Sequence, residues 1–376
     1  MRTICLPLLV VIACSDPGEV RVPRSTATLV GEIDLTIGAP DETREPFLFG
    51  RISGVALHPD GRILVSDQSA ANVRVFSTGG EFLYAFGQRG SGPGDLNWPC
   101  CLAFSPDGTL WVREIGNRRF SLFTIGEGEA TFVRSQRFVI PNPRPLVDRT
   151  AWDENGRAVE VGHLETGLLR ALVDAAGTIA RSDTVHAAPA ESLAVMEVSV
   201  PTPGAVGGGA VYYHEQPYGP VELRAFGPGG EVATAVSSRY SVSWFGSGMA
   251  RVALLQRNLD APVLSERERQ EADSTLDDIA GQRKASRASL EFGVPERKPI
   301  LRMLGFDLDG RLWVERNTPE AQPREADVYD RDGRLIAIMR WPAHVSLAQR
   351  EVSGDTGLGI ATDSDGVQTV VRLRFR

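Results

Sequence analysis

The segment VALHPDGRILVSD, residues 55–67, decides the fold, because it returns as LAFSPDGTLWVRE at residues 102–114. Each copy is an apolar run, a Pro-Asp-Gly turn and a second apolar run, which is the pattern of a β-hairpin. The register holds beyond the hairpin, since Phe76 and Phe123 share the same offset of 47 residues. A unit of this length that cannot bury its own faces stacks against copies of itself. The repeat therefore predicts a β-propeller.

The number of units follows from the turns. Further turns of the same kind occur at Asn155-Gly156, Asp309-Gly310 and Asp365-Gly366. A degraded copy is expected around residues 207–209, where the apolar run 210–213 follows. Hairpins outside this series are expected at residues 76–83, 226–232 and 329–335, and we assign them to the outer halves of blades. Two hairpins per unit predict an all-β, six-bladed propeller of four-stranded antiparallel blades.

The two ends of the predicted ring complete each other. After Asp365-Gly366 only residues 367–375 remain, so we expect two C-terminal strands in the last blade. Residues 27–37 alternate apolar and polar side chains and precede the first full blade without a partner. Pairing this N-terminal strand with the C-terminal hairpin would remove both open edges of the ring.

The N-terminus carries an export signal. Residues 1–3 are positively charged and residues 4–12 are apolar, a run too short to span a bilayer. The tetrapeptide VIAC, residues 11–14, resembles the bacterial lipobox. We predict a lipoprotein signal peptide at 1–13, lipid attachment at Cys14, a tether at 14–25 and the propeller at 26–376. The protein is then exported and anchored to a bacterial membrane, on its periplasmic side or at the cell surface; cleavage of an ordinary signal peptide near Ala13 is the alternative.

Cys100 and Cys101 are adjacent at the start of an expected inner strand. A disulfide between adjacent residues closes an eight-membered ring, outside the usual Cα separation for such bonds. The sequence leaves open whether the two are small packing side chains, a vicinal disulfide or a soft-metal site.

Two further segments resemble known propellers. FGQRGSGPGDLNWP, residues 86–99, resembles the blade-to-blade connection of NHL-repeat proteins. GLGIATDSDGV, residues 357–367, resembles the closing blade of bacterial six-bladed, TolB-like propeller lipoproteins. The resemblance implies the propeller fold and a broad role in binding, and it implies no catalytic residue.

One segment departs from the repeat. Residues 264–290 lack strand alternation, and Ser265 with Glu268 matches a helix capping box. Apolar residues recur in it at helical spacing, at Ala272, Leu276, Ile279 and Ala280. We predict a helical insertion at about 264–292, either covering one edge of the ring or forming a lid over the channel mouth.

Composition limits the chemistry. The net charge of -8 argues against a nucleic-acid partner, and the chain has only five His. The Asp-rich turns near Asp309, Asp332 and Asp365 lack the rest of a calcium loop. We therefore expect no catalytic residue, no cofactor, no metal and a monomeric chain.

Two functions remain. The first is a lipid-anchored, non-catalytic propeller that binds a protein, peptide or glycan at the cell envelope. Its ligand would meet the face built by the loops. The residues that end inner strands and would reach this face are Asp67, Arg113, Glu114 and Arg316. The alternative is a metal-dependent hydrolase or lyase resembling the propeller lactonases, with Glu160, His163 and His214 as possible ligands. No common spacing links these three residues.

Overall fold

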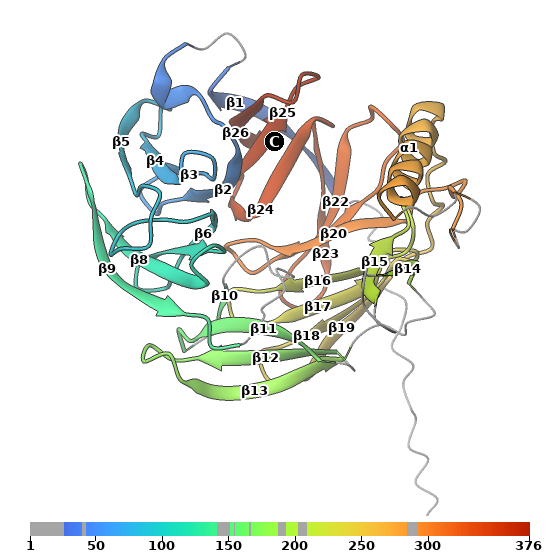
Figure 1. Ribbon diagram of the computed structural model, residues 1–376, viewed down its shortest axis with the longest axis horizontal. Helices are drawn as coiled ribbons and strands as arrows, with labels where there is room; N and C mark the ends of the chain where they lie inside the picture. The colour runs from blue at the N-terminus through green and yellow to red at the C-terminus, as the bar shows by residue number, and fades with distance from the viewer. Residues whose placement is uncertain are drawn as a thin grey trace, which may run out of the picture.

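The computed structural model describes residues 26–39, 43–140, 151–153, 155–164, 167–186, 193–201, 209–283, 287, 290 and 292–376. The chain forms a ring of sheets arranged around a common centre (Figure 1). The predicted signal peptide, the tether and Cys14 lie outside the described residues. No helix in the described part is both long and apolar enough to cross a membrane.

The first two blades contain the repeat that predicts the fold. Blade 1 consists of β2 (Ile52–Leu57), β3 (Ile63–Asp67), β4 (Asn72–Phe76) and β5 (Phe82–Phe86). Blade 2 consists of β6 (Pro99–Phe104), β7 (Leu110–Glu114), β8 (Arg119–Ile125) and β9 (Ala130–Arg137). Both faces of the middle strands are buried because blades stack on either side, so every residue of β3 and β7 is buried. Each fully buried aliphatic or aromatic side chain there contributes about 1.5–3 kcal/mol.

Three further blades follow in chain order. Blade 3 consists of β10 (Ala151–Trp152), β11 (Ala158–Leu164), β12 (Gly167–Val173) and β13 (Ile179–His186). Blade 4 consists of β16 (Glu222–Phe226), β17 (Val232–Val236), β18 (Ser241–Phe245) and β19 (Arg251–Gln256). Blade 5 consists of β20 (Leu301–Phe306), β21 (Leu312–Arg316), β22 (Arg324–Tyr329) and β23 (Leu335–Trp341).

Blade 6 closes the ring with strands from both ends of the chain. It contains β24 (Val345–Ser353), β25 (Thr356–Thr362), β26 (Gln368–Phe375) and, outermost, β1 (Ala27–Ile37). β1 pairs antiparallel with β26 from Gly31 opposite Phe375 to Ile37 opposite Val370. Its first residues, Ala27 to Val30, also pair in parallel with β23 of blade 5. The predicted closure by the N-terminal strand is confirmed.

The composition of blade 6 corrects one prediction. The C-terminus supplies three strands rather than two, and the Asp365-Gly366 turn joins β25 to β26 instead of forming the inner hairpin. β24 escaped the sequence pattern because the polar stretch 349–351 interrupts its apolar run. The pairing of β24 with β25 is irregular at the same place, between Ala348 and Val352.

The fourth blade corrects another prediction. The run 210–213 belongs to β15 (Gly209–Glu215), which pairs only with β14 (Val195–Pro201) in a separate two-stranded sheet. The 226–232 turn therefore joins the inner strands β16 and β17 of blade 4, not two outer strands. Inner and outer hairpins use the same turn chemistry, so an extra hairpin between two blades shifts the assignment. The hairpins at 76–83 and 329–335 are outer ones, as predicted.

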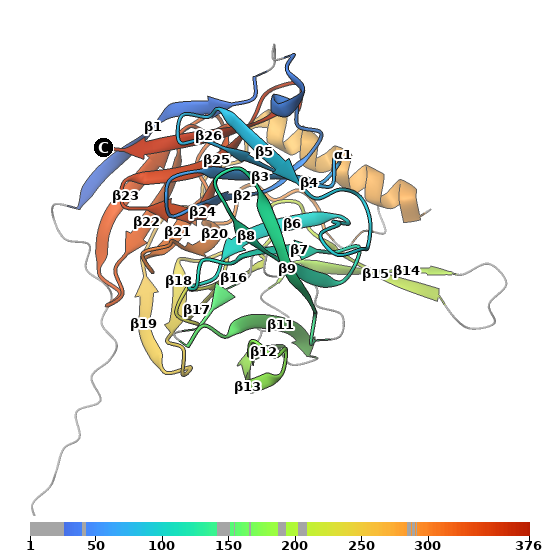
Figure 2. The same cartoon turned by 90° about the vertical axis from the view of Figure 1, so that its left-hand side faces the viewer.

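The helix α1 (Glu266–Arg283) lies between β19 and β20. The Ser265 N–H donates to Glu268 Oε2 at 3.0 Å and the Glu268 N–H donates to Ser265 Oγ at 3.1 Å, which is the predicted capping box. Leu276, Ile279 and Ala280 are buried against the segment around Leu290. α1 and the β14–β15 hairpin project from the same side of the ring (Figure 2).

Candidate functional site: the central cavity

A cavity of about 90 Å³ lies where the inner strands approach their hairpin turns. Its wall takes residues from all six blades: Leu57 from blade 1, Ala103 and Phe104 from blade 2, Ala151 and Trp152 from blade 3, Pro228 from blade 4, Phe306, Asp307 and Leu308 from blade 5, and Glu351 from blade 6. The site is thus a product of the closed ring.

The apolar character of the wall follows from the repeat. Leu57 and Phe104 each end the innermost strand of their blade and occupy equivalent positions in the 47-residue unit. Trp152 and Phe306 end the innermost strands of blades 3 and 5 in the same way. The edge of the His58 ring packs against Phe104, with 5.1 Å between ring centroids. Blades 1, 2, 3 and 5 therefore each place an apolar strand end at the cavity.

Glu351 is a carboxylate in this apolar surrounding. It is 4% exposed, and its Oε2 accepts a 2.7 Å hydrogen bond from the Leu57 N–H. That bond joins blade 6 to blade 1 at the cavity. A buried carboxylate needs such partners, since removing its charge from water without them is costly.

Asp307 is the second acid of the wall, and it organises its own turn. It accepts hydrogen bonds from Trp313 Nε1 at 2.8 Å and from the N–H groups of Asp309 and Arg311 at 3.0 and 2.8 Å. Burial raises the pKa of Asp307 above its ordinary value, although Trp313 and Arg311 partly oppose the rise. Because its oxygens are engaged in the turn, we assign Asp307 a structural role.

Trp152 lines the cavity with a side chain that carries a buried indole N–H. Its side chain is 6% exposed, and its Nε1–H has no hydrogen-bond partner among the residues that the structure describes. Buried polar groups are nearly always paired, and an unpaired one costs about 1–3 kcal/mol. Trp152 also borders a groove of about 460 Å³ between blades 2 and 3, whose wall includes Trp111, Val133 and Arg134. The Trp152 side chain therefore lies between the cavity and the groove.

The acids predicted to bind a ligand lie at the opposite ends of their strands. Asp67 is 1% exposed and accepts hydrogen bonds from the backbone N–H groups of Gly50, Arg51, Ser69 and Ala70 at 3.0–3.2 Å. Glu114 is fully buried and accepts bonds from the Asn97 N–H, Asn117, Arg119 and Ser121 at 2.5–2.9 Å. Each carboxylate thus binds the connection that leads into its blade, and fixes that connection to the blade.

The two predicted arginines are also engaged near this end. Arg113 is buried and lies over the Phe138 ring, 5.1 Å from its centroid. Arg316 forms ion pairs with Glu325 at 2.8 Å and Asp327 at 3.3 Å. None of the four predicted residues lines the cavity. Their role in ligand binding stays a prediction.

The possible metal ligands are not brought together. Glu160 is buried, and its Oε2 accepts hydrogen bonds from the N–H groups of Val139 and Ile140 at 2.8 and 3.0 Å. Burial raises the pKa of Glu160 despite these bonds. The side chain of His163 is not described, and His214 lies on β15, outside the blades. Within the described part of the chain, no three His, Cys, Asp or Glu side chains gather at distances that fit a metal ion.

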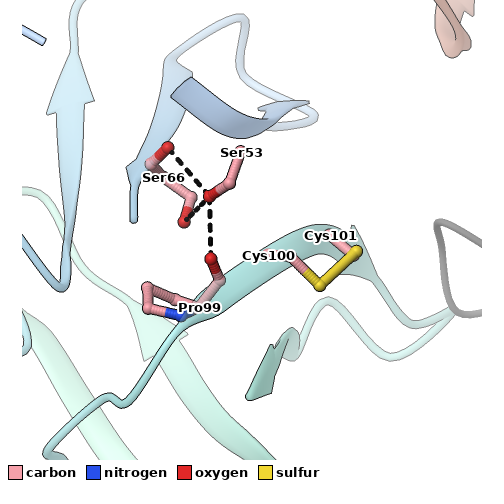
Figure 3. The surroundings of a disulfide bond; sticks show 5 residues. All are labelled: Ser53, Ser66, Pro99, Cys100 and Cys101. Carbon is pink, nitrogen blue, oxygen red and sulfur yellow. Dashed lines mark hydrogen bonds between the residues drawn. A yellow bond between two sulfur atoms is a disulfide. The ribbon is translucent and has the colours of Figure 1, made fainter. Parts of the chain in front are cut away.

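The cysteine pair on β6 forms a disulfide (Figure 3). Cys100 is 7% exposed, and Cys101 is half-buried. Next to the pair, Ser53 Oγ donates a 2.8 Å hydrogen bond to the Pro99 carbonyl, and this bond connects blade 1 to blade 2. Ser53 Oγ also contacts Ser66 Oγ of its own blade at 3.1 Å.

Comparisons with known proteins agree with this architecture. Residues 40–96 match the model of a family described as DUF5128, 6-bladed beta-propeller. A candidate exported protein from Bacteroides fragilis aligns with a TM-score of 0.51 and 12% identity, over 94% of this chain and 98% of that one. No curated protein matches the sequence.

Two enzymes have more distant structural similarity. Virginiamycin B lyase from Staphylococcus aureus aligns with a TM-score of 0.44 and 10% identity, over 94% of this chain and 97% of that one. A gluconolactonase from Xanthomonas campestris aligns with a TM-score of 0.40 and 14% identity, over 94% and 99%. Similarity at these scores supports no inference about activity. The chain is a six-bladed β-propeller whose fold is similar, over nearly its whole length, to that of the Bacteroides protein.

Proposed function

We propose that the chain is an exported, lipid-anchored propeller that binds a protein, peptide or glycan at the bacterial cell envelope without converting it, and that the ligand enters the central cavity. The apolar N-terminal run and the VIAC tetrapeptide before Ser15 support export and an anchor at Cys14. Residues 86–99 and 357–367 support a relationship to NHL-repeat and TolB-like propeller lipoproteins. We also propose a monomer, because a propeller leaves only the short outer edges of its blades open.

The cavity formed by all six blades is the observation that carries the proposal. A mostly apolar pocket with a few fixed polar groups is the usual form of a binding site. Here the polar group is the Glu351 carboxylate, in a wall that is otherwise mostly apolar. This wall suits a ligand that is apolar at its tip and carries a hydrogen-bonding group beside it.

The volume narrows the ligand class. At about 90 Å³ the cavity is smaller than the ~150 Å³ cavity known to take benzene. An aliphatic side chain fits better than an indole. A sugar ring, with hydroxyl groups around its whole edge, would lose most of its hydrogen bonds against Leu57, Phe104 and Leu308. Of the three ligand classes, a peptide or a protein segment with an exposed aliphatic residue fits best.

The binding experiment uses random peptides displayed on phage and selected on the full chain. Affinities of the selected peptides, made synthetically, are then measured for the wild type and for Leu57→Trp, in which the indole fills the cavity. We expect binding to weaken at least about tenfold, or roughly 1.4 kcal/mol. Leu83→Trp is the matched control, since Leu83 is exposed on β5 and distant from the wall. Peptides that bind the wild type and Leu57→Trp with equal affinity would contradict binding in the cavity.

The anchor has a separate test. Cys14→Ala should move the protein from the detergent phase to the aqueous phase in Triton X-114 partitioning, because stable membrane residence requires the acyl chains. Unchanged partitioning would show that Cys14 carries no lipid, and it would leave the binding proposal intact.

A further inference from the structure

The disulfide between Cys100 and Cys101 stands on the innermost strand of blade 2 (Figure 3). Ala103 and Phe104, further along the same strand, line the central cavity. Cys100 is nearly buried, whereas Cys101 is half-buried. A thiol of a second molecule would therefore approach the bond from the side of Cys101.

Adjacency makes this bond reducible. The Cα atoms of adjacent residues are about 3.8 Å apart across a trans peptide, and most disulfides join Cα atoms at about 4.4–6.8 Å. In this protein the separation is 3.7 Å. Disulfides outside the usual geometry store strain and are more easily reduced, and such bonds are commonly the labile, regulatory or catalytic ones.

The backbone around the pair is strained as well. Cys101 has φ of +54°, the left-handed region that non-glycine residues seldom adopt. It is also the bulged residue of β6, because Cys100 pairs with Arg113 and Leu102 pairs with Val112. Backbone outliers of this kind persist only where the surroundings hold them, and they concentrate at functional sites.

The neighbouring blade 1 packs against the bulge at Cys101. A Cβ on Gly54 would lie 2.9 Å from the Cys101 backbone nitrogen, so the inner strand of blade 1 approaches the bulge closely at a residue without a side chain. The bond from Ser53 Oγ to the Pro99 carbonyl fixes the strand before the pair. The ring can therefore keep its shape when the sulfur–sulfur bond is opened.

We propose that Cys100–Cys101 is a redox-active site whose substrate is a dithiol. A thiolate of the dithiol attacks the sulfur of Cys101, the more exposed of the two residues, and Cys100 leaves as a thiolate that takes up a proton. The second thiol of the reductant then attacks the mixed disulfide and releases Cys101 as a thiol. Two electrons and two protons pass to the protein, and the dithiol is oxidised to its cyclic disulfide. The site is independent of the peptide-binding proposal.

The test follows the pair by differential alkylation of the folded full chain. The protein is equilibrated with mixtures of reduced and oxidised dithiothreitol, alkylated, and digested, and mass spectrometry identifies the peptide that contains Cys100 and Cys101. We expect no alkylation before reduction, two alkyl groups after it, and full reversal once the reductant is removed and excess oxidised glutathione is added. The circular dichroism spectrum should persist throughout. Free thiols before any reductant, or a bond that opens only in denaturant, would overturn the proposal.

Single-cysteine variants provide the control. Cys101→Gly removes one thiol and keeps the backbone, since glycine accepts the positive φ. Phenylarsine oxide, which bridges two neighbouring thiols, is the probe. The reduced wild type should bind it about 100-fold more tightly than reduced Cys101→Gly, because the second sulfur–arsenic bond is intramolecular. Equal affinities would show that the two thiols do not act as a pair, and would refute the site.

Discussion

The two ends of the inner hairpins carry opposite chemistry. At the turn end, Leu57, Phe104 and Trp152 surround a cavity with few polar groups. At the opposite end, Asp67 and Glu114 are buried among the hydrogen-bond donors of the connections that enter each blade. The acids end strands at equivalent positions of the repeat, as the apolar residues do.

The difference shows which end has atoms to offer a ligand. A buried carboxylate that already accepts four hydrogen bonds holds the ring together, and a ligand could reach it only by breaking those bonds. An apolar cavity gains contacts when it is filled. Four predictions test this division between a structural end and a binding end.

Deleting residues 26–38 should have the largest effect, because both ends of the hairpins depend on a closed ring. The deletion removes β1 and exposes the edges of β26 and β23. We expect a loss of several kcal/mol, since each buried Leu or Ile side chain contributes about 1.5–3 kcal/mol, together with aggregation. Thermal melting and light scattering measure both. Deletion of residues 15–24 is the control, and equal melting of the two would contradict closure by β1.

Glu114→Ala should be the most damaging single substitution at the structural end. It removes the buried acceptor of the Arg119 Nε–H and of the Asn97 N–H. Removing one partner of a buried ion pair costs about 3–5 kcal/mol. Urea unfolding measures the loss. Asp332→Ala is the control, because the exposed Asp332–Arg334 pair should contribute less than about 1 kcal/mol.

Phe104→Ala should cost less, about 1–2 kcal/mol, because this side chain is only partly buried, whereas truncation of a fully buried Phe costs about 3–5 kcal/mol. The same variant should weaken binding of the selected peptides. Urea unfolding measures the loss of stability and peptide titration measures the loss of affinity, so together they show whether Phe104 serves structure or binding. A loss of stability equal to that of Glu114→Ala would assign both ends to structure and remove the contrast.

The smallest effects are pH-dependent and opposite in sign. Burial raises the pKa of Asp307 in the folded state, so its contribution to stability is greatest in acid and falls as the pH rises from about 4 through the raised value. Asp34 behaves conversely. Burial alone would raise its pKa, but hydrogen bonds from Arg372 and Arg374 lower it below the ordinary value. Its contribution is present above about pH 4 and is lost as the pH falls through the lowered value.

Urea unfolding from pH 3 to 7 separates these two acids. The difference in unfolding free energy between the wild type and Asp307→Asn should fall with rising pH, and that between the wild type and Asp34→Asn should rise. If the two free-energy differences change with pH in the same direction, the direction of the pKa shift assigned to Asp307 or to Asp34 is wrong.

The sequence predicted the features that repeat or that depend on local chemistry. The Pro-Asp-Gly hairpins gave the blades, the unpaired alternation of 27–37 gave the closing strand, and Ser265 with Glu268 gave the start of α1. Predictions from the sequence were wrong where one sequence pattern fits two structures, or where the pattern is interrupted. The 226–232 turn has the same composition in an inner or an outer hairpin, and β24 is interrupted by polar residues.

In the central cavity, too, some wall residues could be predicted from the sequence repeat and others could not. Leu57 and Phe104 share an offset of 47 residues, so their common place at the channel could have been found from the repeat. Pro228 and Glu351 belong to blades whose repeat is degraded, and only the closed ring brings them to the same cavity. Acids at strand ends, such as Asp67 and Glu114, resemble ligand-binding residues in sequence. No pattern indicates that the preceding connection folds back over them.

Closure by β1 also sets the timing of folding. Asp34 on β1 and its partner Arg372 on β26 are separated by 338 residues, so the ring cannot close before almost the entire chain has been synthesised. Contacts this distant in sequence form slowly, since much chain entropy is lost before they stabilise anything. Until then β1 is an unpaired strand, and the edges that it later covers are open to other chains. The step most exposed to misassembly is therefore the last one, when the first strand of the propeller meets the final one.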